Sequence, residues 1–564
     1  MYVYFWRWAA WKVFDAHDAD RHGVVCFISP SGWTTGPGGR GMRAYLRRTC
    51  DEGWIINLSP EGQRADVATR VFPGVAQPLA ICIFVRKATV ERGERRTARV
   101  HYRSVPGRRD EKFQQLRGVE LDDEGWKDTH ADGVRPFAPA TQSGWEDFPT
   151  LHDLFPWSTL GVTSNRSWTS APTAEILRRR WVTLVRESDP ADKAELFKIT
   201  GDRTLTSKKE PLPERSHPPR PIGRECNLQP QLVRTALRSF DRQWLIADNR
   251  VLDRPRPDLW AALQPDQLFL NQQSSHEIDS GPGIVATHLL PDTHHFNGRG
   301  GRVLPVLHPD GSPNVTDGLL TYMAHAMGGE PVTVMDLAAY TVAVTGHSAF
   351  TERFAEDLLT PGVRLPLTRD PELWRRATAV GRELLWASTY GERYAAPGAG
   401  RPSGAIEFPS GDERQVRYLT HIGSGVPERM SYEAETQTLR VGDGTFAPVP
   451  EAVWAYHVGG MRVVNKWFGY RKAKPTSKRT SPLDDIHVES WPPEWTKELI
   501  ELLSVLRRLT DLGPAQSDLL TDILAGPVAT HAELMAAGVL LASEAGRKPR
   551  YRPVDGLFAA DVPT

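Results

Sequence analysis

Three short apolar runs near the amino terminus decide the fold: residues 23–28 (GVVCFI), 54–58 (WIINL) and 78–85 (PLAICIFV). Their β-branched and large apolar residues, flanked by Gly, Pro or Ser, predict buried strands. Between the first two runs, residues 41–50 (GMRAYLRRTC) predict an amphipathic helix. The order strand, helix, strand, strand predicts an α/β sheet of parallel strands, with an antiparallel strand at one end as a variant.

Residues 1–14 (MYVYFWRWAAWKVF) are rich in aromatic side chains. They lack the basic start, aliphatic centre and small-residue cleavage site of a secretory signal. Tyr4, Trp8 and Trp11 recur at helical spacing, which predicts one face of a buried aromatic helix. Because no earlier strand is available for such a helix to pack on, we expect the chain to begin in the middle of a fold. With no signal and few cysteines, the cytoplasm is the expected compartment.

The composition excludes several classes of protein. The chain has 564 residues, of which 40% are hydrophobic and 24% charged, so extensive disorder is excluded. Lys and Arg total 69, as do Asp and Glu, which excludes a uniformly basic coat but not local basic patches. The four cysteines are too few for a disulfide scaffold and too widely spaced for a zinc knuckle. No run of about 18 apolar residues occurs, so no membrane span is expected.

Later segments predict further helices and one hairpin. Residues 203–222 are polar and proline-rich, which is typical of a linker or a long surface loop. Helical patterns occur at 333–360, 371–390 and 494–509. Residues 441–444 (VGDG) resemble the start of a glycine-rich nucleotide loop, but their position between short alternating segments favours a β-hairpin turn.

Other candidate sites are weak. The histidines near Asp292 have no standard zinc spacing, which favours a polar loop over a metal site; they are His288, His294, His295 and His308. His347-Ser348 lacks the strained elbow and the oxyanion hole of a hydrolase. We therefore predict no catalytic residue and no metal ligand.

Residues 462–479 (RVVNKWFGYRKAKPTSKR) contain seven basic residues and no acidic one. Trp467, Phe468 and Tyr470 alternate with the basic residues. Basic groups neutralise phosphates, and exposed aromatic rings stack on bases, so this pattern is typical of nucleic-acid binding. A solvated loop whose aromatic rings lie in a core is an equal alternative.

Residues 2–86 carry a resemblance to a known class of enzyme. Their pieces are YVYFWRWAAWKVF, GVVCFISPSGW, GMRAYLRR, WIINLSPEG and VFPGVAQPLAICIFVRK. This succession resembles the second half of an adenine-N6 DNA methyltransferase of the gamma class, from just after its N-P-P-Y catalytic loop. The resemblance implies the C-terminal half of a Rossmann-like methyltransferase sheet.

Most of the remaining chain resembles the specificity domain of single-chain, ATP-dependent restriction–modification enzymes, called type ISP. The matching motifs include FPW (155–157), RRW (179–181), RSFDRQW (238–244), RPR (254–256), FTERF (350–354), GREL (381–384), YHVGG (456–460) and KWFGYR (466–471). Their order is more specific than any single motif. The resemblance implies a phage-defence enzyme that acts on double-stranded DNA.

The resemblance also divides the chain into domains. Residues 1–105 would be the last part of the methyltransferase core, and 106–230 a connector with the start of the specificity region. Residues 231–490 would form a mixed α+β target-recognition domain, and 491–564 a C-terminal helical segment.

The departures from the family pattern concern its catalytic parts. The chain has no F-x-G-x-G loop after a predicted strand, no N-P-P-Y motif, no Walker A loop and no nuclease signature. The resemblance therefore implies S-adenosylmethionine as the cofactor of the complete enzyme, with none bound by this chain alone. Two functions stay open: the DNA-specificity part of a truncated or split methyltransferase that needs a partner chain, and a stand-alone, non-catalytic DNA-binding module.

The resemblance names candidate site residues. Phe72, in the V-F-P piece, would contact a flipped adenine, with a core residue as the alternative. Tyr4 and Phe5 would approach the cofactor, with core packing as their alternative. Several of the basic candidates would instead be structural, paired with Asp241, Asp248 or Asp253. The DNA-binding candidates are Arg166, Arg180, Arg238, Arg242, Arg254, Arg256, Lys466, Trp467, Arg471 and Lys472.

Overall fold

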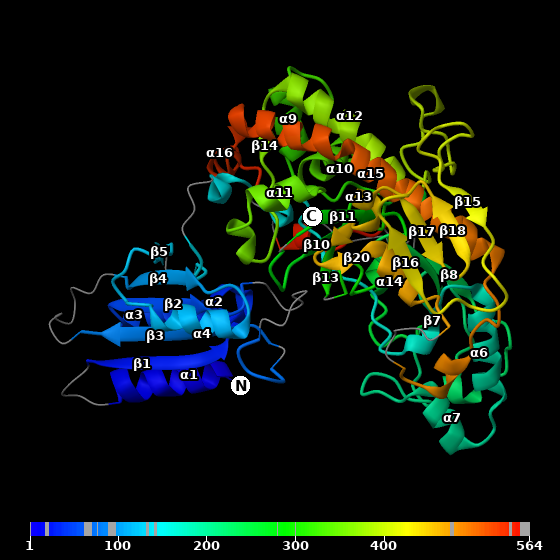
Figure 1. The fold of residues 1–564 in the computed structure, drawn as a ribbon, viewed down its shortest axis with the longest axis horizontal. Coiled ribbons are helices and arrows are strands. Elements are labelled where there is room, and N and C mark those ends of the chain that lie inside the picture. Colours follow the sequence, from blue (N-terminus) through cyan, green and yellow to red (C-terminus); the bar gives the residue numbers. More distant parts are fainter. Residues whose placement is uncertain are drawn as a thin grey trace, which may run out of the picture. The chain divides into compact units, whose positions relative to one another are not determined.

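The chain folds into two units (Figure 1). Unit 1 comprises Met1–Glu146, Gln273–Asp279 and Thr351–Val363, and unit 2 comprises Asp147–Gln272, Ser280–Phe350 and Arg364–Thr564. The structure is a computed structural model. It describes residues 2–16, 22–60, 70–75, 77–87, 97–130, 135–139, 144–278, 280–298, 300–473, 479–540 and 544–552.

Unit 1 is built on a sheet whose strand order is β1-β3-β2-β4-β5. β1 and β2 both run antiparallel to β3, and β2 runs parallel to β4, so β1, β2 and β4 point the same way. The bounds are β1 Gly23–Pro30, β2 Glu52–Asn57, β3 Leu79–Arg86, β4 Arg99–Ser104 and β5 Lys127–Asp128.

The three strands predicted from the apolar runs are confirmed, as is the helix between the first two, α3 (Arg40–Thr49). The antiparallel strand, however, lies inside the sheet and not at its end. The reason is that β3 is apolar on both faces. Residues on its two faces pack into different clusters, Phe84 into the one beneath α1 and Ile81 against the one formed by Ile56 and Leu58, which suits a strand inside a sheet covered on both faces.

The amino-terminal helix α1 (Tyr2–Ala10) continues into a π-helical turn, η1 (Trp11–Asp15). Trp6 and Phe14 face the sheet, and the indole N–H of Trp6 donates to Ser29 Oγ at 3.1 Å. The face predicted to be buried is instead exposed: Tyr4 is 80% exposed, and Trp8 and Trp11 are also exposed. Because the helix is apolar all round, spacing could not decide which stripe packs on the sheet.

The described residues of unit 2 contain three four-stranded sheets. One large core joins α6 (Ala174–Arg186) to two of these sheets, and Leu212 and Ile222 of the proline-rich stretch pack into it. The sheets are β11-β10-β13-β6 (Ile284–Thr287, Phe269–Gln273, Gly301–Pro305, Thr159–Leu160), β12-β8-β9-β7 (Leu290–Pro291, Leu232–Arg238, Asp241–Ile246, Ser170–Ala171) and β15-β18-β17-β16 (Arg417–Thr420, Gly444–Ala447, Thr438–Val441, Met430–Glu433).

Three long helices pack together in unit 2: α10 (Val334–Thr345), α12 (Pro371–Ser388) and α15 (Pro493–Ala525). The helices predicted at 371–390 and 494–509 are confirmed, and α15 extends well beyond its predicted end. The pattern at 333–360 divides at Gly346 into α10 and α11 (Ser348–Arg353).

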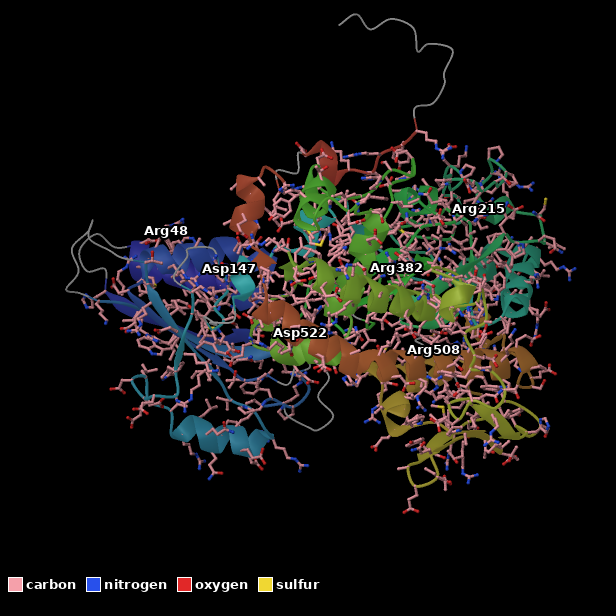
Figure 2. The ribbon with its side chains drawn as sticks, turned by 90° about the horizontal axis from the view of Figure 1, so that it is seen from above. Arg48, Asp147, Arg215, Arg382, Arg508 and Asp522 are labelled. Carbon is pink, nitrogen blue, oxygen red and sulfur yellow. The ribbon has the colours of Figure 1, made fainter. Side chains whose placement is uncertain are left out.

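Polar contacts fasten α15 along its length. Figure 2 labels Arg508 and Asp522 on this helix. Asp522 pairs with Arg376 of α12 at 2.9 Å, and Arg508 Nε donates to the Ile406 carbonyl at 3.0 Å. The helix is therefore held to the rest of unit 2 by ion pairs as well as by its apolar face.

The predicted hairpin is also confirmed. β17 and β18 pair antiparallel, with Val441 opposite Gly444. Gly442 has a φ of 56°, which a glycine adopts without strain in a tight turn. The VGDG segment is thus a hairpin turn and does not begin a helix. In the described part of the chain, every helix is too short or too polar to cross a bilayer.

Candidate nucleic-acid interface

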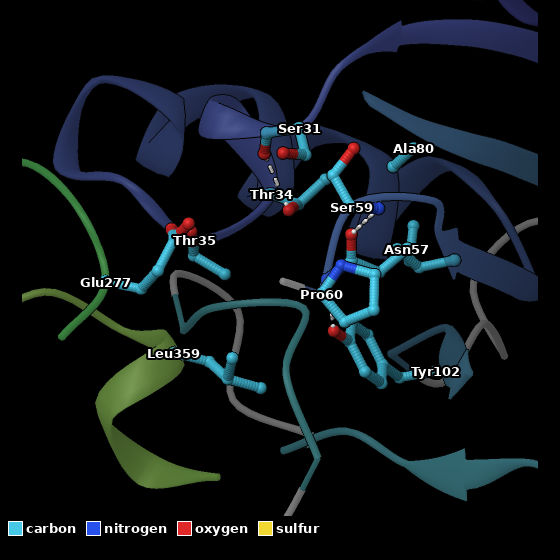
Figure 3. A pocket seen from close by; sticks show the side chains of 11 residues that line it. Ser31, Thr34, Thr35, Asn57, Ser59, Pro60, Ala80, Tyr102, Glu277 and Leu359 are labelled. Atoms are coloured by element: carbon cyan, nitrogen blue, oxygen red, sulfur yellow. Dashed lines mark hydrogen bonds between the residues drawn. The ribbon is translucent and has the colours of Figure 1, made fainter. Parts of the chain in front are cut away.

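A small cavity lies at the ends of the parallel strands of unit 1 (Figure 3). Asn57 donates to the Tyr102 hydroxyl at 2.9 Å and accepts from the backbone N–H of Ser59 at 2.9 Å. Burial raises the pKa of Tyr102. The cavity holds about 30 Å³, room for about two waters. Ligands of open α/β sheets bind at this edge, but in pockets of about 300–1,000 Å³, so the cavity is too small for a base or a cofactor.

Phe72 lies after β2, in the described stretch 70–75. Its side chain is 40% exposed, whereas the adjacent Val71 is buried in a small cluster with Ile56 and Leu58. In this segment it is therefore Val71 that packs into the core. Phe72 presents its ring outward, and its contact with a flipped base stays a prediction.

Tyr4 and Phe5 lie on the outer face of α1 and are both exposed. On β1, the end strand of the described sheet, Val24 and Ile28 are also exposed. The neighbouring Val25 and Ser29 are buried beneath α1, so Val24 and Ile28 lie on the opposite face of the sheet. Two groups of residues are here together called the open edge: the exposed residues of α1 (Tyr4, Phe5, Trp8 and Trp11) and the exposed residues on the other face of β1 (Val24 and Ile28).

In unit 2, Arg166 is fully buried and donates to the Asp253 carboxylate. Its Nε donates to the carbonyls of Phe197 and Lys198, both at 3.0 Å. Its guanidinium also lies 4.3 Å from the centre of the Phe197 ring. This side chain is therefore used inside the domain and ties three segments together.

Arg471 has a similar internal role. Its guanidinium bonds Asp241 at 2.9 Å and Glu498 at 3.2 Å, and it lies 3.9 Å from the ring of Trp467. Both Arg471 and Trp467 are buried. The aromatic rings of this basic segment thus pack inward. Lys474 and Lys478 lie outside the described residues.

Three further candidates also have internal partners. Arg238 pairs with Asp292 at 2.9 Å, and Arg242 pairs with Glu501. Arg180 donates to the carbonyls of Trp168 and Ser170 at 3.2 and 3.1 Å, and burial lowers its pKa to about 10. The expected pairing with Asp253 and Asp241 is present for Arg166 and Arg471. Asp248, the third expected carboxylate, pairs with Arg250.

The remaining candidates reach the surface. The side chain of Arg254 is 61% exposed and lies 3.8 Å from Asp202. Arg256, Lys466 and Lys472 are half-buried, and the Lys466 ammonium lies 5.0 Å from the Tyr470 ring. These four positions are the part of the predicted set that an outside ligand reaches in this conformation. Contact with DNA stays a prediction for all of them.

The histidines near Asp292 are mostly buried in this structure. Burial lowers the pKa of His288 and of His295 to about 3, so both are neutral at physiological pH. Within the described residues, no group of three or more His, Cys, Asp or Glu is arranged to hold a metal ion. Sequence reasoning missed two sources of surface charge: Arg302, isolated in an apolar strand, and residues 546–552 (GRKPRYR), a short basic run near the carboxyl end.

Comparison with solved structures identifies the fold. The cryo-EM structure of a DrdV–DNA complex has a TM-score of 0.62 and 18% identity, and the match covers 93% of this chain and 52% of that one. The ATP-dependent Type ISP restriction–modification enzyme LlaBIII, bound to DNA, has a TM-score of 0.60, 15% identity and coverage of 93% and 34%. The chain thus spans about half of DrdV and about a third of LlaBIII.

A nuclease-deletion mutant of the Type ISP enzyme LlaGI, in complex with a DNA substrate mimic, gives a TM-score of 0.56 and 17% identity, over 89% of this chain and 39% of that one. No curated protein matches the sequence. Residues 153–502 match the family described as the Type ISP C-terminal specificity domain. Since this match spans more than half of the sequence, the chain belongs to the Type ISP C-terminal specificity domain family.

Proposed function

We propose that this chain is the DNA sequence-specificity part of a site-specific adenine-N6 methyltransferase of a type ISP restriction–modification system. The observation that carries the proposal is the family match over residues 153–502. The fold also supports the proposal, because 93% of this chain aligns with the structure of the Type ISP enzyme LlaBIII bound to DNA. Double-stranded DNA is therefore the proposed ligand of unit 2.

Unit 1 supports a link to a methyltransferase core. Its strands β1, β2 and β4 are parallel, and β3 runs antiparallel between the first two. We infer that this is the C-terminal half of a Rossmann-like sheet, ending at the open edge. Parallel sheets are normally covered on both faces, so a strand with exposed Val24 and Ile28 favours further polypeptide at this edge.

The described residues of unit 1 do not by themselves fit S-adenosylmethionine. Tyr4 and Phe5 offer aromatic surface on an exposed helix face, and the cavity at the strand ends holds about 30 Å³. We propose that the cofactor loop and the N-P-P-Y loop come from a partner polypeptide. No step of methyl transfer is assigned to residues of this chain.

Selection from random duplexes tests the specificity. The purified full chain should enrich one DNA sequence, and a duplex that carries it should bind at least about tenfold more tightly than a scrambled duplex of equal length. If no sequence is enriched, the specificity function is refuted.

Co-expression tests the partner. With a polypeptide that carries F-x-G-x-G and N-P-P-Y, the selected site should become methylated at adenine N6. Ile28→Glu at the open edge should abolish methylation without changing DNA binding, because the charge blocks an apolar contact. Arg48→Glu, at an exposed position of α3, is the matched control. Site-specific binding without methylation by the co-expressed pair would instead favour the stand-alone module.

A further inference from the structure

The basic residues near the carboxyl end return to the surface of unit 2. Residues 544–552 lie beyond the stretch that matches the family. The Asp310 N–H donates to the Arg550 carbonyl at 3.1 Å, and the Arg550 N–H donates to His308 Nδ1 at 3.2 Å. The Tyr551 hydroxyl donates to the Asp258 carboxylate. This stretch, here called the basic strap, is thus docked on the domain by backbone and side-chain bonds.

The outward side chains of the basic strap are cationic. Arg547, Lys548, Arg550 and Arg552 are all exposed. Arg550 has a carboxylate neighbour, Asp317, at 3.4 Å. The backbone bonds hold the segment in place, so its cations are presented at defined positions rather than on a loose tail.

Three arginines from other segments lie close to one another. Arg254 exchanges both backbone hydrogen bonds with Thr163, and Arg302 of β13 pairs with Leu160 of β6. Both therefore flank the same short stretch of chain. Burial lowers the pKa of Arg256, and the charges of Arg254 and Arg302 lower it further. The Arg256 guanidinium is thus near enough to the other two to be repelled by them, while the Asp258 carboxylate acts in the opposite direction.

His152 connects this trio to the basic strap. Burial lowers its pKa to about 4, and the nearby charges of Arg302 and Arg547 act in the same direction. Ser158 lies between His152 and Arg302: its hydroxyl is 3.2 Å from His152 Nδ1 and accepts from Arg302 Nε at 2.8 Å. The His308 ring, which accepts from the Arg550 N–H, stacks on Trp157 with the ring centres 5.2 Å apart, so the basic strap docks beside the contact between Ser158 and Arg302.

Carboxylates neutralise only part of this patch, since Arg254 lies 3.8 Å from Asp202 and Arg550 lies 3.4 Å from Asp317. Arg238, Arg242 and Arg471 each bond a carboxylate inside unit 2. Among the described residues, by contrast, Arg256 and Arg302 form no ion pair. Arg256 Nε is buried without a hydrogen-bond partner in the described structure, and the residue has a left-handed φ of 58°.

We propose that Arg254, Arg256, Arg302 and Arg547, with the exposed cations of the basic strap, form a strip that binds the phosphate backbone of double-stranded DNA. This inference rests on the proposed function and adds a site to it. Guanidinium groups bind phosphate through paired N–H donors, and a row of them on an exposed surface suits a polyanion. Phosphate contacts carry no sequence information, so the strip adds affinity and register but not specificity.

The test is the salt dependence of DNA binding by the full chain. The dissociation constant is measured across a salt series for the selected duplex and for a scrambled duplex. Each phosphate contact contributes a slope of about 0.9 in the logarithmic plot, so Arg302→Gln with Arg547→Gln should flatten it by about 1.8. Binding to the two duplexes should weaken by the same factor. Arg440→Gln, which removes an exposed arginine paired with Glu433 on a distant hairpin, should leave the slope unchanged.

A second variant guards against a folding defect. Arg547→Gln alone changes an exposed side chain and should flatten the slope by about 0.9. If the double and single variants keep the slope while site selection persists, the strip is refuted and the specificity function stands. If no sequence is enriched but duplexes bind with a slope that falls in the variants, the strip stands and the specificity function fails. If the unaltered chain binds no duplex, both are refuted.

Discussion

Replacing Arg471 by alanine should destabilise unit 2 and leave its DNA contacts intact. The Arg471 side chain is fully buried between Asp241 at 2.9 Å and Glu498 at 3.2 Å. Removing one partner of a buried ion pair costs about 3–5 kcal/mol, because the other charge stays buried without compensation. Here Asp241 keeps a bond from Gln243 at 2.7 Å and Glu498 keeps Arg234 at 2.8 Å, so the lower half of that range is expected.

The corresponding change in melting temperature follows from the size of unit 2. At about 2.1 cal/mol/K per residue, the roughly 400 residues of unit 2 have an unfolding entropy of about 0.8 kcal/mol/K. A loss of about 3–4 kcal/mol then lowers the melting temperature by about 4–5 °C. Differential scanning calorimetry of the full chain measures this transition directly.

The matched variant is Lys466→Ala, five residues before Arg471 and half-buried at the surface. It should leave the melting temperature within about 1 °C and flatten the salt slope of DNA binding by about 0.9. Arg471→Ala should instead lower the melting temperature and leave the salt slope unchanged, when binding is measured at a temperature where the variant is folded. If Arg471→Ala keeps the melting temperature and flattens the salt slope, the assignment of this arginine to the interior is wrong.

Three further outcomes are expected. Gly381→Ala should destabilise the α10–α12 contact by about 1–3 kcal/mol or more, because the added Cβ would lie 1.9 Å from the Ala339 carbonyl oxygen; calorimetry with an unchanged transition would contradict this packing. Phe72→Ala should leave thermal stability unchanged while Val71→Ala lowers it, and equal effects in the same melts would show that Phe72 is a core residue. Unit 2 should lose stability as the pH falls from about 6.5 towards about 3, because His295 takes up its proton near pH 6.5 only in the unfolded chain. His295→Gln should weaken this pH dependence of the melting temperature. A variant whose pH profile of melting equals that of the unaltered chain would refute the prediction.

Local pattern was sufficient for much of the secondary structure. The runs that became β1, β2 and β3 are short, apolar and flanked by turn residues, so each reads correctly without its neighbours. The same holds for α12 and the hairpin of β17 and β18. The order of the strands was not readable, because pairing joins residues that are far apart in the chain. β3 therefore took an internal position that the pattern had placed at an end.

For the site residues, too, the sequence indicated the residue type but not the position in the fold. Residue type within the motifs that carry the resemblance nominated ten positions for DNA binding, and the same motifs indicated the family that matches residues 153–502. The sequence does not distinguish an arginine in a buried ion pair from an arginine on the surface. Burial depends on which distant carboxylate the fold brings near. Asp253 lies 87 residues from Arg166, and Asp241 lies 230 residues from Arg471.

The sequence by itself determined the family, the strand-forming runs and the total charge. The tertiary structure alone decided which faces are covered and which cations reach the surface. Trp6 rather than Trp8 packs on the sheet because both stripes of α1 are apolar and only the neighbouring sheet distinguishes them. Arg302 and Arg547 belong to one charged strip because a β-pairing and a docked carboxyl-terminal segment bring together residues that no local pattern connects.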